Sequence, residues 1–91
     1  MRAGRTQMMY YNYVLKSELD SNLYIGWTED LENRVKMHNQ GLVESTKNRR
    51  PLELVYYEAC LVKENAIKRE KQLKTGFGRA YLKRRLYCPV G

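Results

Sequence analysis

The stretch NYVLKSELDSNLYIGWT, residues 12–28, decides the fold because two strand-like segments flank a polar tetrapeptide. Residues 10–16 and 22–27 are rich in tyrosine and in branched apolar side chains, which favour β-strands. The intervening Ser-Glu-Leu-Asp, residues 17–20, has the composition of a four-residue turn. The sequence therefore predicts a β-hairpin.

The pairing of this hairpin determines which side chains share a face of the sheet. If Lys16 faces Ser21, then Tyr13 faces Tyr24 across the two strands. Gly26 leaves space beside these tyrosines, as a strand glycine does where a ligand or another chain segment approaches. The tyrosine face comprises Tyr11, Tyr13, Tyr24 and Gly26, and the opposite, aliphatic face comprises Val14, Leu23, Ile25 and Trp27.

Outside the hairpin, the sequence predicts three helices and one more strand. Thr28 is the expected N-cap of a helix over residues 29–40, which stops at Gly41. A polar, basic loop at 42–51, a strand at 52–58 and helices at 62–74 and 79–87 follow. The order ββαβαα predicts an α/β (α+β) domain, with helices packed on a small antiparallel sheet.

The length of 91 residues fits one domain, predicted over residues 10–88 and preceded by a flexible arm at 1–9. The chain has no run of eighteen apolar residues, and its basic start lacks the apolar segment of a secretory signal. Cys60 and Cys88 form no CxxC pair, so we expect reduced thiols without a disulfide partner and a cytoplasmic location.

The net charge of +7 lies in one segment of the chain. Residues 1–62 carry eight basic and eight acidic side chains, whereas residues 63–85 carry nine basic and two acidic ones. This asymmetry favours a polyanionic partner, although a solvated lysine-rich helix face would have the same composition. We expect nucleic-acid contacts from the 47–50 loop and the basic helices, comprising Lys47, Arg49, Arg50, Lys68, Lys71, Lys74 and Arg79.

Two polar side chains fall on the buried stripe of the helix predicted at 29–40. Leu31 and Val35 define this stripe, and Arg34 and His38 lie in the same arc. Arg34 could extend its guanidinium to solvent or form a structural ion pair, and His38 could be satisfied by backbone groups. Both residues could instead belong to a functional site.

Glu70 lies near the centre of the apolar arc predicted for the helix at 62–74. That arc is marked by Val62, Ala66, Ile67, Leu73 and the following Phe77. A carboxylate at such a position needs a partner, because an unpaired buried charge costs several kcal/mol. The partner could be Arg34 or a lysine, or it could be Mg²⁺, which prefers hard oxygen ligands.

Together these residues resemble the GIY-YIG endonuclease superfamily, from about Tyr10 to Lys74. The stretch LYIGWTEDLENRVKMH, residues 23–38, supplies a YIG triplet at 24–26, then Arg34 and His38. AIKREKQLK, residues 66–74, is similar to the family's Ala-x-x-x-Glu-x-x-x-Lys helix, and RRPLELVYYE resembles the strand before it. The resemblance implies a three-stranded antiparallel sheet and metal-dependent hydrolysis of one DNA strand. It also suggests a role in DNA repair or recombination, because the excision-repair nuclease contains a domain of this family.

The resemblance also implies roles for individual residues. Tyr13 matches the GIY tyrosine and Tyr24 the YIG tyrosine, and one of them would act as general base toward the attacking water. Arg34 would hold the scissile phosphate, and His38 would assist by hydrogen bonding. Glu70 would bind a single divalent metal ion, Mg²⁺ or Mn²⁺.

The chain departs from the family pattern at three places. Only the tyrosine of the GIY triplet is present, in Asn12-Tyr13-Val14. Trp27 stands where many members have a lysine, so Arg34, a loop lysine such as Lys47, or the metal would have to lower the pKa of the tyrosine base. Leu82 stands where the excision-repair nuclease has an asparagine.

Three functions are therefore compared. The first is a metal-dependent DNA endonuclease whose target is set by DNA structure, since 91 residues leave no domain for reading bases. The second is a catalytically weak or inactive nucleic-acid-binding module on the same fold, for DNA or RNA. The third is a scaffold that binds another protein through its tyrosine-rich surface, and the charge and the polar constellation make it the weakest.

Overall fold

The computed structural model describes residues 8–87. Strands β1 (Tyr10–Ser17), β2 (Leu23–Thr28) and β3 (Leu52–Cys60) form an antiparallel sheet in the order β2-β1-β3. The helices are α1 (Leu31–Asn39), α2 (Lys63–Leu73) and α3 (Gly76–Tyr87), and a 3-10 turn, η1 (Lys47–Arg49), precedes β3. The predicted ββαβαα order and α+β class are confirmed.

Some predictions concern residues that the structure does not describe. Most of the arm predicted at 1–9 and Cys88 lie outside residues 8–87. Cys60 lies within them as a free thiol, whose Sγ is 3.3 Å from the carbonyl oxygen of Val62. Among the described helices, none is both long enough and apolar enough to cross a membrane.

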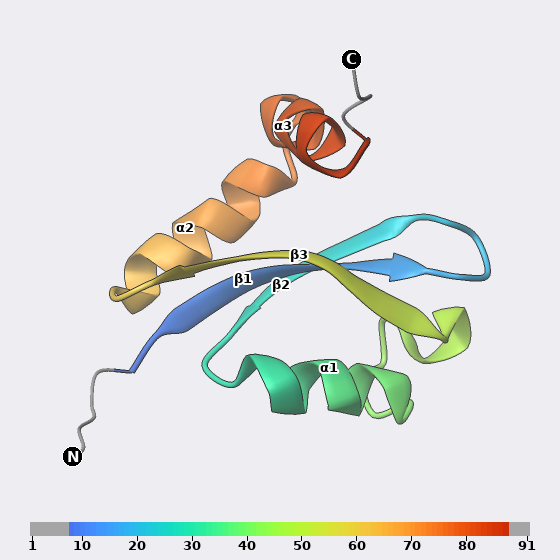
Figure 1. Ribbon diagram of the computed structural model, residues 1–91. Helices are drawn as coiled ribbons and strands as arrows, with labels where there is room; N and C mark the ends of the chain where they lie inside the picture. The colour runs from blue at the N-terminus through green and yellow to red at the C-terminus, as the bar shows by residue number, and fades with distance from the viewer. Residues whose placement is uncertain (1–7, 88–91) are drawn as a thin grey trace.

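The sheet is covered by helices on both faces, with α1 against one face and α2 and α3 against the other (Figure 1). Because β1 is the central strand, its side chains are buried alternately on the two sides. Tyr13 and Leu15 pack with Leu31 on the α1 face, whereas Val14 packs with Leu73 on the opposite face. The predicted division into a tyrosine face and an aliphatic face is thus confirmed.

The predicted strand register is wrong by two residues. Tyr13 pairs with Gly26 rather than with Tyr24, and Lys16 pairs with Leu23. The connection between the strands spans residues 18–22 and begins one residue later than the predicted turn, because Ser17 still belongs to β1. Its hydroxyl oxygen accepts hydrogen bonds from the backbone N–H groups that begin the turn, at 3.1 and 3.4 Å. A shift of two residues keeps every side chain on its predicted face.

Several helix boundaries also differ from the prediction. Asp30, not Thr28, caps α1, since its carboxylate accepts a hydrogen bond from the N–H of Asn33 at 3.2 Å. Gly41 follows the end of α1 with φ +80°, as expected for a helix stop. Helix α3 begins at Gly76 instead of residue 79, and Phe77 is 92% exposed rather than part of the apolar side of α2.

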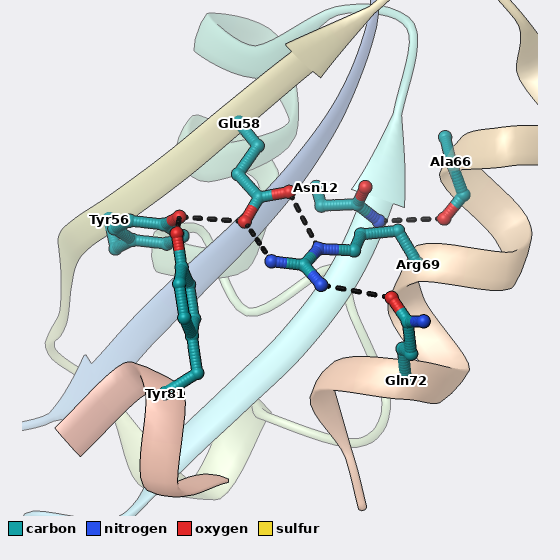
Figure 2. A network of polar contacts seen from close by, with 7 residues as sticks. All are labelled: Asn12, Tyr56, Glu58, Ala66, Arg69, Gln72 and Tyr81. Carbon is teal, nitrogen blue, oxygen red and sulfur yellow. Dashed lines mark hydrogen bonds and ion pairs between the residues drawn. The ribbon is translucent and has the colours of Figure 1, made fainter. Parts of the chain in front are cut away.

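A network of polar contacts joins β3 to α2 and α3 (Figure 2). The Glu58 carboxylate accepts two hydrogen bonds from Arg69, each 2.8 Å long, and a third of 2.6 Å from the hydroxyl of Tyr56. The Arg69 guanidinium lowers the pKa of Glu58, so the pair is ionised at neutral pH. On β1, Asn12 Nδ2 donates to the Ala66 carbonyl at 2.8 Å. These contacts fix α2 on the sheet, and with it Glu70, the neighbour of Arg69.

Candidate active site

Tyr13, in the middle of β1, is the residue around which the candidate site is built. Its ring crosses Gly26 so closely that a Cβ atom at position 26 would lie 2.6 Å from the phenolic oxygen. Arg34 Nε donates a hydrogen bond to this oxygen at 3.3 Å, and His38 Nε2 lies 2.9 Å from it. Because only 1% of Tyr13 is exposed, strand, glycine and α1 hold the phenol in one place.

The electrostatic surroundings of Tyr13 keep it protonated at neutral pH. Burial raises the pKa of the phenol, and the hydrogen bond and charge of Arg34 only partly oppose this effect. The nearby Tyr24 and Glu70 raise the pKa further, because each would place a second negative charge close to the phenolate. Ionisation of Tyr13 therefore requires additional positive charge.

Tyr24, on β2, lies diagonally across from Tyr13 as a result of the register. The ring centroids of the two tyrosines are 6.4 Å apart, and that of Tyr24 is 5.1 Å from the His38 ring. Tyr24 is half-buried and lines an open cleft between β2 and α3. Its ring packs with Tyr13 and His38 on the α1 face, so Tyr24 borders both this cluster and the cleft.

His38, near the end of α1, is fully buried and uncharged at neutral pH. Burial, followed by the charge of Arg34, lowers its pKa to about 4. Its Nε2 lies 2.9 Å from the Tyr13 hydroxyl and its Nδ1 lies 2.7 Å from the hydroxyl of Thr46. Both ring nitrogens therefore bond to side chains, and the alternative in which backbone groups satisfy His38 is wrong.

The lowered pKa of His38 predicts a pH-dependent stability. The unfolded chain takes up a proton near pH 6.5 and the folded chain only near pH 4, so the unfolded state binds more protons between these values. This contribution to stability is complete above pH 6.5 and is lost as the pH falls toward 4, by at most about 3 kcal/mol.

Urea unfolding at pH 7, 6 and 5 measures this loss. A His38→Gln variant, less stable overall, should lack the slope above pH 5, whereas carboxylates such as Glu58 contribute only at lower pH. Equal slopes in the two proteins would contradict the buried neutral histidine.

Arg34 uses only part of its guanidinium within the fold. Its Nε bonds to Tyr13, and residues 8–87 offer no hydrogen-bond acceptor to its two terminal amino groups. The ion pair with Glu70 that the sequence left open is absent there, because the partner of Glu70 is Lys74, with Nζ and Oε2 3.3 Å apart. The half-buried Arg34 can therefore bind an anion with two parallel N–H groups.

Glu70, on α2, can provide one carboxylate to a metal ion. Its side chain is 21% exposed, and within the described residues its Oε1 has no hydrogen-bond partner. No cluster of three or more His, Cys, Asp or Glu side chains occurs in the described part of the chain. A single carboxylate fits Mg²⁺, which keeps several waters and takes its other ligands from substrate phosphate.

Comparison with known proteins agrees with this geometry. A profile of the GIY-YIG catalytic domain matches residues 9–85. The chain belongs to the GIY-YIG family. Domains of this family are nucleases, so its substrate class is nucleic acid, and they generally use divalent metals.

Proteins of the UPF0213 group are similar to this chain over most of its length. A UPF0213 protein of Staphylococcus saprophyticus is 43% identical over 67 residues, which cover 72% of this chain and 80% of the relative. One from Clostridium perfringens is 45% identical, covering 72% and 71%. The solution NMR structure of a UPF0213 protein from Bacillus halodurans aligns with a TM-score of 0.52 and 32% identity over 82% of each chain.

The structure unites four of the five predicted central residues of the GIY-YIG site around one phenol. Arg34 and His38 both lie within hydrogen-bond distance of the Tyr13 oxygen. The ring of Tyr24 lies beside the rings of Tyr13 and His38. These four residues do not line a single hollow: Tyr24 is among the residues that line the cleft, and Arg34 lines a second hollow that runs from Trp27 to Asp30. Glu70 is linked to the cleft through Lys74.

The predicted nucleic-acid contacts are distributed over several surfaces of the GIY-YIG domain. Lys74 and Arg79 line the cleft beside Tyr24. Lys47 forms an ion pair with Glu44 at 3.1 Å and shares a shallow hollow with Arg50. The remaining members are Arg49, paired with Asp20, Lys68, which lines a groove beside Glu58, and Lys71, which is exposed on α2.

Sequence reasoning missed three residues that the structure places at this site. Thr46 bonds to His38 from an irregular loop, where no periodic pattern could have indicated it. Lys83 and Tyr87 line the cleft from α3 together with Arg79, at spacings of four residues that put all three on one side of a helix. That spacing was visible in the sequence, but the strand they face was not.

Proposed function

We propose that this protein is a divalent-metal-dependent DNA endonuclease that hydrolyses one phosphodiester bond at a time and selects DNA by structure. The observation that carries this proposal is the buried Tyr13 phenol, held between Arg34 and His38 over Gly26. Within residues 8–87 the Arg34 guanidinium leaves its two terminal amino groups for a further acceptor.

Arg34 is proposed to bind the scissile phosphate. Its Nε is fixed on Tyr13, and the free terminal amino groups can form two parallel hydrogen bonds to phosphate oxygens. As water attacks, negative charge grows on these oxygens, and a guanidinium already oriented by the fold stabilises it without reorganisation. Arg34 also takes the place of the family lysine that Trp27 replaces, because its charge opposes the rise in the Tyr13 pKa.

Tyr13 is proposed as the general base, with Tyr24 orienting the water from the cleft side. Tyr13 accepts a hydrogen bond from Arg34, whose positive charge favours the ionised phenol, whereas Tyr24 is half-buried and partly open to water. Since the pKa of Tyr13 is raised in the free protein, cleavage should rise with pH through neutrality.

Glu70 is proposed to hold one Mg²⁺ or Mn²⁺ ion through Oε1, which has no hydrogen-bond partner among residues 8–87. When bound, such an ion supplies positive charge to the phosphate oxygens and to a nearby phenol. Lys74, which lines the cleft, lies 3.3 Å from the other carboxylate oxygen and holds Glu70 beside it.

The cleft beside Tyr24 is proposed to hold the sugar-phosphate backbone. It has a volume of about 670 Å³ and is lined by residues 22–25 of β2, by Lys74 and by one side of α3. Its three charged lining residues, Lys74, Arg79 and Lys83, are all cations. A groove with cations and no carboxylate, next to the candidate catalytic tyrosine, suits a polyanion.

Replacing Lys83 with alanine tests whether the cleft holds the sugar-phosphate backbone. Because each phosphate contact releases about one counterion, the slope of log Kd against log salt should fall by about 0.7–0.9, equally for different DNA sequences. Fluorescence anisotropy between 50 and 200 mM salt measures the slope. Lys36→Ala is the matched control, because Lys36 is also exposed, on α1, and is not among the residues that line the cleft. An unchanged slope in Lys83→Ala would contradict the proposed position of the DNA backbone in the cleft.

A cleavage assay tests the function itself. Purified protein is incubated with labelled plain, nicked, flapped and branched duplexes, and with a matched RNA, in Mg²⁺, Mn²⁺ or EDTA. We expect metal-dependent nicking that favours branched or flapped DNA, which would also suit a role in repair or recombination. Salt-sensitive binding without cleavage in any metal would contradict the proposal and support an inactive binding module.

A further inference from the structure

A buried chain of polar atoms continues behind the tyrosine of the candidate site. Arg34 Nε donates to the Tyr13 oxygen at 3.3 Å, His38 Nε2 lies 2.9 Å from the same oxygen, and His38 Nδ1 lies 2.7 Å from Thr46 Oγ1. His38 and Thr46 are fully buried. The chain thus runs from β1 through α1 to the loop before β3.

The hydroxyl of Thr46 bonds to His38 instead of capping the 3-10 turn that follows it. Thr46 occupies the N-cap position of η1, where a threonine side chain ordinarily accepts a hydrogen bond from the backbone, but it makes no such bond. Its hydroxyl is directed instead to His38. The hydroxyl therefore serves the buried histidine and not the start of the 3-10 turn.

The number of hydrogens in the chain indicates which state of Tyr13 it fits. With a neutral phenol, Tyr13, His38 and Thr46 together carry three polar hydrogens but are joined by only two hydrogen bonds. One hydroxyl hydrogen therefore has no acceptor among residues 8–87. With a phenolate, Nε2–H and Arg34 Nε–H both donate to Tyr13, and the Thr46 hydroxyl donates to Nδ1. In that state every hydrogen and every ring lone pair is used.

We propose that Thr46 is a positioning residue that lets His38 move its proton from Nδ1 to Nε2 when Tyr13 ionises. In the neutral state the phenol, the stronger donor, bonds to Nε2, and Nδ1–H donates to Thr46. In the ionised state Thr46 rotates its hydroxyl to donate to Nδ1. The two states differ by one proton released to solvent and by the position of the imidazole proton.

The groups around His38 are consistent with this exchange. It faces Tyr13 on β1, Tyr24 on β2, Arg34 on its own helix and Thr46 on the loop, and the charge of Glu70 on α2 acts on Tyr13. The low pKa of His38 keeps the imidazole neutral, so it exchanges tautomers rather than becoming a cation. The inference rests on the proposed function only in taking Tyr13 as the group that ionises.

The single histidine of the chain makes the test direct. A fluorinated tyrosine that ionises near neutral pH is placed at position 13, histidine is labelled with ¹⁵N, and spectra are recorded without DNA below and above its pKa. We expect Nδ1–H at low pH and Nε2–H at high pH. A proton that stays on one nitrogen throughout would overturn the proposal.

Substitutions at Thr46 supply the second measurement. Thr46→Val keeps the shape but lacks the hydroxyl, so the pKa of the fluorotyrosine should rise by about one unit, and Thr46→Ser should restore it. The pH midpoint of DNA nicking should move in the same direction. An unchanged pKa in Thr46→Val would overturn the role of Thr46, whereas a wild type that never cleaves DNA would remove the proposed function and leave these spectra interpretable.

Discussion

Replacing Glu70 with glutamine is expected to reduce DNA nicking on the order of 1,000-fold at saturating Mg²⁺. The neutral amide keeps the size of the side chain but is a much weaker ligand for a hard cation, so the charge stabilisation that the ion supplies is lost. Folding should change little, because the ion pair between Glu70 and Lys74 contributes only about 0.3–0.5 kcal/mol. Single-turnover nicking across a range of Mg²⁺ and Mn²⁺ concentrations measures the effect.

Glu64→Gln is the matched control for this substitution. Glu64 lies on the same helix but is exposed at its first turn, away from the cleft. Its replacement removes the same charge and should leave nicking within about twofold of the wild type. If Glu70→Gln cleaved as fast as this control, the assignment of Glu70 as the metal ligand would be wrong.

Replacing Gly26 with alanine is expected to lower the rate of nicking by about 100-fold or more while the protein still folds. The added Cβ would lie 2.6 Å from the oxygen of Tyr13 and 2.7 Å from its ring carbon Cζ, closer than non-bonded atoms allow. The buried ring must move away, which breaks its contacts with Arg34 and His38. Loss of a positioned general base typically costs 10²–10⁴-fold in rate, and overpacking costs about 1–3 kcal/mol of stability.

Gly76→Ala provides the contrast. A Cβ at Gly76 has open space around it, and the residue begins α3, so alanine should leave nicking unchanged and slightly raise the melting temperature. Calorimetry and the nicking assay together separate a site effect from a general effect of removing glycine. Wild-type nicking by Gly26→Ala would show that the position of the Tyr13 ring does not matter for cleavage.

Local patterns in the sequence predicted much of the fold. The alternation of Tyr13, Val14 and Leu15 assigned the two faces of β1, and this survived the wrong register because a slip of two residues conserves the faces. The register was not predicted, and the end of β1 is held by contacts of Ser17, whose hydroxyl bonds to the turn and to the carbonyl oxygen of Arg49 at 2.7 Å. That second partner lies 32 residues away, so no local pattern contains it.

Some residues of the candidate site were likewise predictable from the sequence, and others were not. Arg34, His38 and Glu70 stood out because each is polar at a position where helical periodicity predicts an apolar side chain. Thr46 did not stand out, since a threonine in a polar loop breaks no local rule. Its role exists only because the loop after α1 brings it to 2.7 Å from the histidine.

By itself the sequence determined the order of the elements, the faces of the central strand and the residue types available for phosphodiester chemistry, because hydrophobic periodicity and residue chemistry are local properties. Only the tertiary structure decided that Glu70 does not pair with Arg34, that Tyr13 lies over Gly26, and that Lys83 faces β2 across a cleft. These facts depend on distances between segments far apart in the chain, which packing of the two helical layers on the sheet sets.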